Sequence, residues 1–117
     1  MSPDLELIQK GQSESFRAWS HDYPHAVARW HFHPEYEIHL ITRSSGTMFV
    51  GDHVGSFVPG NLVITGPNLP HNWVSDIPAD ESVAERDLVV QFPAAFAQKL
   101  LSVFPELAPM RAVLEEA

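Results

Sequence analysis

Proline and glycine interrupt the chain so often between residues 14 and 92 that only short segments lie between them. Several of these segments alternate apolar and polar side chains, which is the period of a strand with one buried face. The expected strands cover residues 14–20, 26–33, 36–42, 61–65, 71–75 and 85–92, and residues 46–58 are expected to form a hairpin. Short strands at such close spacing are typical of a β-sandwich or a β-barrel.

The breaks between these strands carry turn residues. The hairpin is expected to turn at residues 51–53, and Pro59 and Gly60 suit the two central positions of a type II turn. The strand over residues 61–65 is expected to be buried, and a loop with two prolines, residues 66–70, follows it.

The period changes after residue 92, where apolar residues recur at helical spacing and Pro93 suits a first helical turn. We expect one helix over residues 93–104 and a second over residues 105–117, and the sequence leaves open whether the second continues further. The two helices share an apolar stripe, which consists of Phe96, Leu100, Leu107, Met110 and Leu114. The stripe serves either a partner, such as a second copy, or the flank of the chain's own β-structure.

Charge and composition exclude several classes of protein. Fifteen acidic and seven basic side chains give a net charge of −8, whereas nucleic-acid binding relies on Lys and Arg to neutralise phosphates. No apolar run approaches the roughly 18 residues of a membrane span, and acids stand where a signal peptide carries positive charge. Cysteine is absent, so thiolate chemistry is excluded. We expect a cytoplasmic protein that binds neither a membrane nor, through this segment, nucleic acid.

A cluster of ionisable residues occupies residues 29–39. His31 and His33 are two apart, so on a strand both imidazoles face the same side. Pro34 cannot donate to a sheet ladder, and a turn there would bring Glu37 back beside the two histidines on the next strand. His71, which opens a strand after a Pro-containing loop, is the natural further ligand. Three imidazoles and one carboxylate would suit a divalent first-row metal.

Other interpretations of these residues stay open at this point. The cluster is alternatively a polar pocket for a small ligand or a wet strand edge. His39 shares the strand face of Glu37 and would line such a pocket together with Trp30 and Trp73, although the tryptophans also suit packing. His21 and His25 lie in an expected loop and are predicted to be solvated, Glu35 is expected to point into water, and we expect no chemistry at His53 on the hairpin tip. No catalytic residue stands out.

The cluster and the later turns resemble the two motifs of the cupin superfamily. The first motif has the form His-x-His, three or four residues, Glu and a later Gly. His31, His33 and Glu37 match it, whereas the later Gly arrives at Gly46 instead of nearer position 44. The second motif is matched by Pro59, Gly60, Pro67, Pro70 and His71. Asn68 stands where this motif has Gly, and Asn tolerates the positive φ that the turn requires.

The resemblance is closer to one group of cupins. Residues 51–73 resemble the N-terminal sensor domain of AraC-type transcription regulators, and residues 91–117 resemble the helical segment that follows the barrel there. The resemblance implies an all-β double-stranded β-helix, the cupin or jelly-roll barrel, over about residues 14–92. One or two C-terminal α-helices over residues 93–117 would complete a single domain of 117 residues.

The family implies three possible functions. As a sensor domain, the chain would bind a small-molecule effector inside the barrel and form a homodimer, while a C-terminal DNA-binding domain outside this chain would contact DNA. As a metal-dependent cupin enzyme of the dioxygenase or isomerase type, it would hold its catalytic metal through His31, His33, Glu37 and His71. As a binding or storage protein it would have neither activity. We expect the sensor, with Zn, Ni, Mn or Fe as the possible metal.

Overall fold

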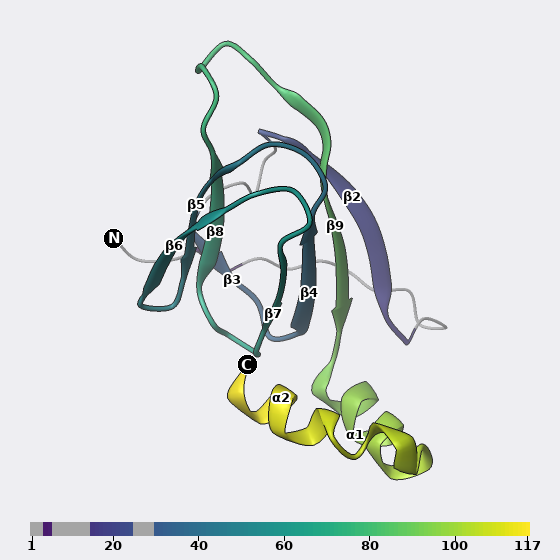
Figure 1. Cartoon of the computed structure of the whole chain (residues 1–117). Coiled ribbons are helices and arrows are strands. Elements are labelled where there is room, and N and C mark those ends of the chain that lie inside the picture. Colours follow the sequence, from purple (N-terminus) through teal and green to yellow (C-terminus); the bar gives the residue numbers. More distant parts are fainter. Residues whose placement is uncertain (1–3, 6–14, 25–29) are drawn as a thin grey trace.

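Two antiparallel sheets and a C-terminal helical segment make up the protein (Figure 1). The structure is a computed structural model, and it describes residues 4–5, 15–24 and 30–117. One sheet has the strand order β1-β3-β8-β5-β6, and the other has the order β2-β9-β4-β7. The first contains β1 (Asp4–Leu5), which pairs in parallel, β3 (His31–Phe32), β8 (His71–Ser75), β5 (Gly46–Val50) and β6 (His53–Phe57). The second contains β2 (Arg17–Tyr23), β9 (Val83–Phe92), β4 (Tyr36–Ile41) and β7 (Leu62–Thr65).

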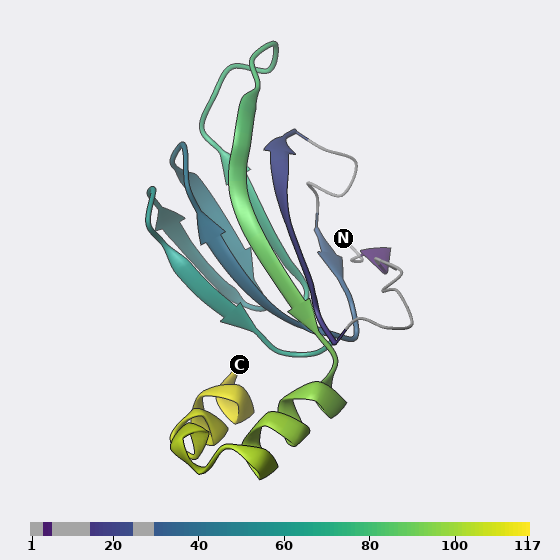
Figure 2. The ribbon, with the colours of Figure 1, turned by 90° about the vertical axis from the view of Figure 1, so that its right-hand side faces the viewer.

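The sheets face each other, and the helices lie beyond one end of their strands (Figure 2). The apolar core between the sheets is small: Ile41, Phe57 and Trp73 are almost fully buried there, with Met48 and Val50 packed against them. No strand pairing joins the two sheets among the described residues, so the barrel is not closed. The mostly β architecture with two C-terminal helices confirms the predicted fold class.

Most expected strands form where the sequence places them. Residues 71–75 are β8, and the expected hairpin is β5 and β6. The strand predicted over residues 14–20 starts later and extends to Tyr23, and that predicted over residues 26–33 has only β3 within the described residues, because residues 25–29 lie outside them. The full burial predicted for residues 61–65 is wrong, since β7 is an edge strand and Leu62 is 59% exposed.

Two loop residues adopt the left-handed backbone that their turns require. Gly60 has a φ of 94°, as the type II turn predicted, and Asn68 has a φ of 62°. Asn68 also donates its backbone N–H to the carbonyl of His33, at 2.6 Å. The tolerance of Asn for positive φ is therefore used here, and it ties the loop before β8 to the end of β3.

The helical segment begins as predicted and then departs from the prediction. Helix α1 (Ala94–Val103) starts directly after Pro93. The second helix is interrupted: a 3-10 turn (Pro105–Leu107) precedes α2 (Met110–Glu116). Pro109 explains the break, because proline lacks the N–H that a continuous helix would donate. Neither helix in the described part of the chain has the length and apolar character of a transmembrane span.

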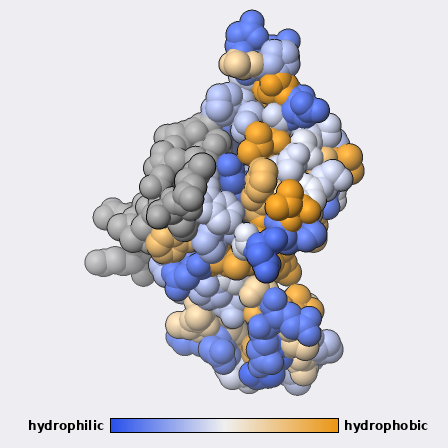
Figure 3. All heavy atoms as spheres, turned by 90° about the vertical axis from the view of Figure 1, so that its left-hand side faces the viewer, coloured by the Kyte–Doolittle hydropathy of each residue, from blue (hydrophilic) through white to orange (hydrophobic). Residues whose placement is uncertain are grey.

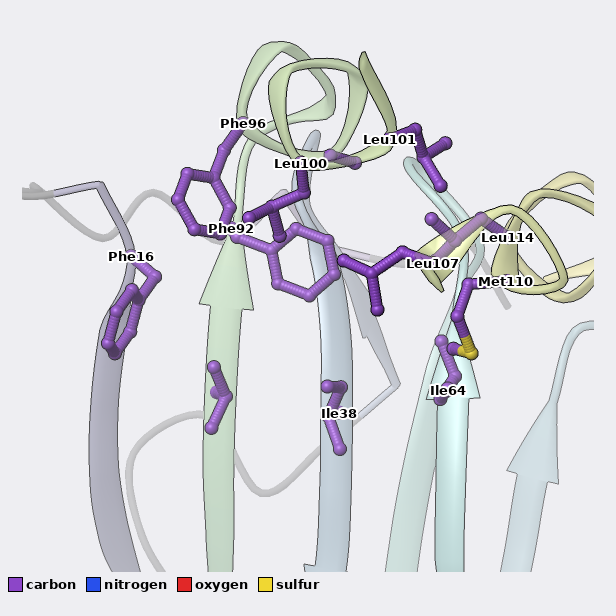
Figure 4. Close-up of a pocket in the computed structure, with 12 residues that line it drawn as sticks. Phe16, Ile38, Ile64, Phe92, Phe96, Leu100, Leu101, Leu107, Met110 and Leu114 are labelled. Carbon is purple, nitrogen blue, oxygen red and sulfur yellow. The ribbon is translucent and has the colours of Figure 1, made fainter. Parts of the chain in front are cut away.

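The apolar stripe of the helices faces the sheet that contains β4, β7 and β9 (Figure 4). Phe96, Leu100, Leu107 and Leu114 turn toward that sheet, and together with Met110 they line a pocket between the helices and the sheet. Of the two roles left open for the stripe, this arrangement corresponds to covering the flank of the chain's own β-structure.

Gly46 occupies a position where β5 and β8 approach each other closely. A Cβ on Gly46 would lie 1.9 Å from the carbonyl oxygen of Val74, whereas a Cβ on Gly55 would meet only side-chain ends of His53 and Met48.

We predict that Gly46→Ala lowers the free energy of unfolding by about 3 kcal/mol, because the backbones of β5 and β8 must move apart. Gly55→Ala, the matched control on the neighbouring strand, should cost less than about 1 kcal/mol. Urea denaturation measures both, and equal losses would contradict the close approach.

Candidate metal and ligand site

The space between the two sheets is lined by polar as well as apolar side chains. Strand β4 alternates, so that Glu37, His39 and Ile41 are buried while the residues between them are half-buried. The buried polar side chains are His31, His33, Glu37, His39, Thr65, His71, Ser75, Arg86, Asp87 and Gln91. Buried ionisable groups are costly unless they are paired or bind a ligand, so this interior is the candidate site.

Three histidines come together at the junction of β3 and β8. His31 and His71 stand opposite each other in the register of these strands, and His33 follows directly after β3. One ligand atom from each lies within 4.8 Å of the others. The ring of His71 packs edge-on against both partners, with centroid distances of 4.5 Å to His31 and 4.9 Å to His33. The turn and strand parity expected from the sequence therefore do bring these side chains together.

The carboxylate of Glu37 completes this cluster from the opposite sheet. Its Oε1 lies 3.2 Å from Nε2 of His33, and its Oε2 lies 3.3 Å from Nε2 of His71. The amide of Gln91, directly across from Glu37 in the register of β4 and β9, donates to Oε1 at 3.1 Å. Glu37 is thus held between the neighbouring strand and the histidines.

Backbone carbonyls assign the tautomers of two histidines. Nδ1 of His33 lies 3.1 Å from the carbonyl oxygen of Glu35, and Nδ1 of His71 lies 2.8 Å from that of Leu69. A carbonyl only accepts, so both Nδ1 atoms donate, and in a neutral His71 ring Nε2 carries a lone pair. Burial, opposed by Glu37 and reinforced by His31 and His33, lowers the pKa of His71 to about 4. Neutral His71 therefore presents its Nε2 lone pair to a carboxylate oxygen.

The Glu37 side of this contact is anionic. Burial raises the pKa of Glu37, but the hydrogen bond from His33 and the charges of His71 and His39 outweigh it and hold the pKa at about 2. Nε2 of His71 has no hydrogen-bond partner among the described residues. The three histidines could hold a metal ion, and the carboxylate of Glu37 lies beside two of them.

A second polar cluster surrounds Asp87 on β9. Its Oδ1 lies 3.2 Å from Nδ1 of His21, and its Oδ2 lies 3.5 Å from Nε2 of His39. Arg86 donates to Oδ2 through Nε and NH2, both at 3.0 Å. Burial raises the pKa of Asp87, but the hydrogen bonds from the two histidines and the charge of Arg86 hold this pKa well below its usual range.

Arg86 connects the two sheets. Its NH1 donates to the carbonyl of Trp73 at 2.7 Å and to the hydroxyl of Ser75 at 3.0 Å, and its guanidinium lies over the ring of Tyr23. Burial lowers the pKa of Arg86, while its contacts with Asp87 oppose that change. The pair of Arg86 and Asp87 is therefore a buried ion pair that is also hydrogen-bonded across the interior.

The predicted ligand-binding residues lie between the two clusters, with one exception. His39 and Trp73 stack with ring centroids 3.7 Å apart and an interplanar angle of 12°. Trp30 is half-buried directly before β3, and its role in ligand binding stays a prediction. Three buried polar atoms here have no hydrogen-bond partner among the described residues, namely Nδ1 of His39, Oγ1 of Thr65 and Nε1 of Trp73. A polar ligand would satisfy them.

The structure corrects two expectations and leaves a third outside its scope. His21, predicted in a solvated loop, lies on β2, accepts a hydrogen bond from Trp19 and pairs with Asp87. The carbonyl of Glu35 accepts from His33, and the residue is half-buried instead of pointing fully into water. His25 lies outside the described residues, while His53 is exposed.

Sequence reasoning missed Arg86 and Asp87 altogether. The sequence feature that could have indicated Asp87 is the alternation of β9, in which Asp87 shares a strand face with Val89 and Gln91. A carboxylate on the inward face of a strand implies a buried partner, but the parity does not reveal which residues supply it.

Comparisons with known proteins agree with this architecture. The family model described as AraC-like ligand binding domain matches residues 15–109. Among solved structures, plu4264 protein from Photorhabdus luminescens superposes with a TM-score of 0.51 at 14% identity, covering 82% of this chain and 78% of that one. This likeness concerns the fold alone.

Two further structures are similar at lower scores. Rru_A2000 from Rhodospirillum rubrum, described as a cupin-2 domain, has a TM-score of 0.49 at 15% identity and coverages of 92% and 75%. A cupin 2 conserved barrel domain protein from Salinispora arenicola CNS-205 has a TM-score of 0.47 at 16% identity and coverages of 84% and 80%. A search of curated protein sequences finds no match.

Asp87→Asn should destabilise the protein in a pH-dependent way. The amide leaves Arg86 buried without its counter-charge, so we expect a loss of about 3 kcal/mol in the free energy of unfolding at neutral pH. The pKa of Asp87 is depressed in the folded state from an ordinary value of 3.8. Its ionised form therefore stabilises the fold above that pH, and the contribution is lost as the pH falls below it.

Denaturant unfolding of wild type and variant at several pH values measures this difference. It should be constant from neutral pH down to about pH 5 and shrink below about pH 4. Asp52→Asn, at the exposed turn between β5 and β6, is the control and should change stability by less than about 0.5 kcal/mol. A difference that stays the same in acid would show that the ion pair is not its cause.

Proposed function

We propose, from the premise that this chain belongs to the AraC-like ligand binding domain family, that it is the effector-sensing domain of an AraC-type transcription regulator. The observation that carries the proposal is the family match over residues 15–109, which spans both sheets from β2 to β9 and helix α1. The effector is a small molecule that binds between the two sheets, where the buried polar side chains gather.

The interior supports a polar effector. Trp73 offers an indole N–H, which only donates, and His39 and Thr65 offer further buried polar atoms without partners among the described residues. Each such atom costs free energy until it is hydrogen-bonded. A ligand with an acceptor directed at Trp73 would recover that cost, which favours carboxylates, sugars and other oxygen-rich molecules over hydrocarbons.

The metal is the second part of the proposal. His31, His33, His71 and Glu37 would hold a divalent ion such as Zn, Ni, Mn or Fe, because three imidazoles and a carboxylate converge there. When bound, the ion would supply a positive centre for an oxygen of the effector. Gln91 and the carbonyls of Glu35 and Leu69 orient these ligands through their hydrogen bonds.

The output of the sensor would come from other parts of the regulator. With a net charge of −8 this segment does not suit a phosphate backbone, so we propose that DNA is bound by a separate C-terminal domain. The regulator would act in the cytoplasm as a homodimer. Helices α1 and α2, which share an apolar pocket with β4, β7 and β9, would transmit its occupancy.

A stand-alone metal-dependent enzyme of the dioxygenase or isomerase type is the second candidate. The same three-histidine, one-carboxylate cluster favours it, because such a donor set leaves positions on the ion for a substrate. Turnover separates the two candidates. A sensor would leave its ligand unchanged, whereas an enzyme loaded with its metal would convert it to a product that mass spectrometry detects.

The purified chain should contain close to one equivalent of a divalent transition metal, or take it up on titration. His71→Ala should weaken metal binding about a hundredfold or more, because it removes a ligand, and His53→Ala, on the exposed hairpin, should leave it unchanged. Since the pKa of His71 is about 4, protons should compete at this ligand only near that pH. Elemental analysis and competitive titration measure both effects, and no uptake by the wild type would refute the metal site.

Effector binding should depend on the indole N–H of Trp73. We expect a thermal-shift screen of small carboxylates and sugars to identify a stabilising ligand. Trp73→Phe, which removes the indole N–H together with the five-membered ring, should weaken its binding about tenfold or more. Trp30→Phe tests the other predicted tryptophan. Titration calorimetry measures the affinities, and an effector that binds both variants as tightly as wild type would place its site elsewhere.

A further inference from the structure

A second cavity lies on the opposite face of the sheet from the metal and ligand site. It has a volume of about 330 Å³, lies between the outer face of the sheet and the helical segment, and is partly open to solvent (Figure 4). Its floor contains Ile38, Ile64 and Val90, one from each of three neighbouring strands, β4, β7 and β9. Leu100 of α1 and Leu114 of α2 are part of its roof.

The wall of this cavity is entirely apolar. All 12 residues that line it carry hydrocarbon or thioether side chains, and it exposes no polar surface. Water gains no hydrogen bonds from an apolar wall, so an apolar pocket favours apolar molecules over water. An empty cavity also costs stability, because its walls lack packing partners. The energetics therefore favour an apolar occupant.

The shape of the cavity restricts how an occupant enters. The leucines of the roof turn toward the sheet, so an occupant would lie between the helices and the sheet. Phe16, 49% exposed, and Met110, 37% exposed, are the most exposed residues of the lining. By contrast, the face of the molecule in Figure 3 intersperses apolar and polar side chains.

We propose that this cavity is a second binding site, specific for a neutral, hydrocarbon-like small molecule. The volume lies within the range of small-molecule pockets, about 300–1,000 Å³. A charged group inside would lose its hydration without any partner on the wall, which excludes carboxylates and ammonium ions from the interior.

This site goes beyond the proposed sensing function and does not depend on the metal. Strand parity separates the two: Ile38 faces the apolar cavity, whereas its neighbours Glu37 and His39 face the polar interior. A ligand in either place therefore contacts the same strand without contacting the other ligand.

Titration with N-phenyl-1-naphthylamine, a neutral apolar fluorophore, tests the proposal on the full 117-residue chain. We expect saturable binding with blue-shifted emission, and the same affinity with chelator as with added zinc. 1-Octanol should displace the probe at least about tenfold better than octanoate, because the carboxylate would be desolvated. Equal displacement by the two competitors would overturn the claim that the site is specific for neutral molecules.

Two pairs of variants locate the probe. Ile64→Phe fills the floor of the cavity and should weaken binding at least about tenfold, whereas Leu62→Phe, on the same face of β7 but outside the lining, should stay within about twofold. Leu100→Trp fills the cavity from α1, and Val103→Trp, which is 64% exposed on the same helix, is its control. Thermal unfolding identifies any variant that fails to fold. If one pair contains such a variant, the other pair decides whether the probe binds in this cavity.

Absence of saturable binding, or equal losses within both pairs, would overturn the site. Light scattering adds a further test: a dimer that excludes the probe and dissociates in Ile64→Phe would assign the cavity to a second copy of the chain and overturn the small-molecule site. A metal-free chain that still binds the probe would support this site even if the metal proposal fails.

Discussion

The burial of two carboxylates between the sheets is the constraint on which the rest of this structure depends. Glu37 and Asp87 are both almost fully buried, and each is surrounded by imidazole or guanidinium groups instead of water. A buried charge without partners would oppose folding by several kcal/mol. The positions of β2, β3 and β8, which supply those partners, are therefore tied to the two strands that carry the carboxylates.

The charges of the two carboxylates are balanced by different kinds of group. Asp87 has a permanent cation, Arg86, which is also anchored to the carbonyl of Trp73. Glu37 faces His71, whose low pKa leaves it neutral near physiological pH, so a lone pair meets an anion. The Asp87 cluster therefore contains its own cation, whereas the Glu37 cluster would receive one in the proposed metal site. His39 shares the strand face of Glu37 and contacts Asp87, and thereby links the two.

Strand parity gives the second sheet two chemically distinct faces. Its inner face carries the ionisable side chains, and its outer face carries the aliphatic floor under the helices. One layer of backbone therefore separates the inner face from the residues next to the helices. In the proposed sensor, this layer would carry the signal of an occupied site to the C-terminal segment.

The sequence by itself determined the local features of this protein. The hairpin of β5 and β6, the start of α1 at Pro93, the positive φ of Asn68 and the shared face of His31 and His33 all follow from side-chain period or backbone chemistry within a few residues. Pro109 also indicated the break before α2, although the helical spacing of the apolar residues around it led to the prediction of one helix over residues 105–117.

Only the tertiary structure decided which distant residues meet. Glu37 and His71 converge because their strands lie in opposing sheets, and His21 reaches Asp87 because β2 pairs with β9. The apolar cavity exists because the helices lie beyond one end of the strands, and their apolar side chains do not fill the space next to the outer face of β4, β7 and β9. Periodicity reports the side of a strand on which a residue lies, but burial, pKa and cavity volume depend on what the rest of the chain places opposite it.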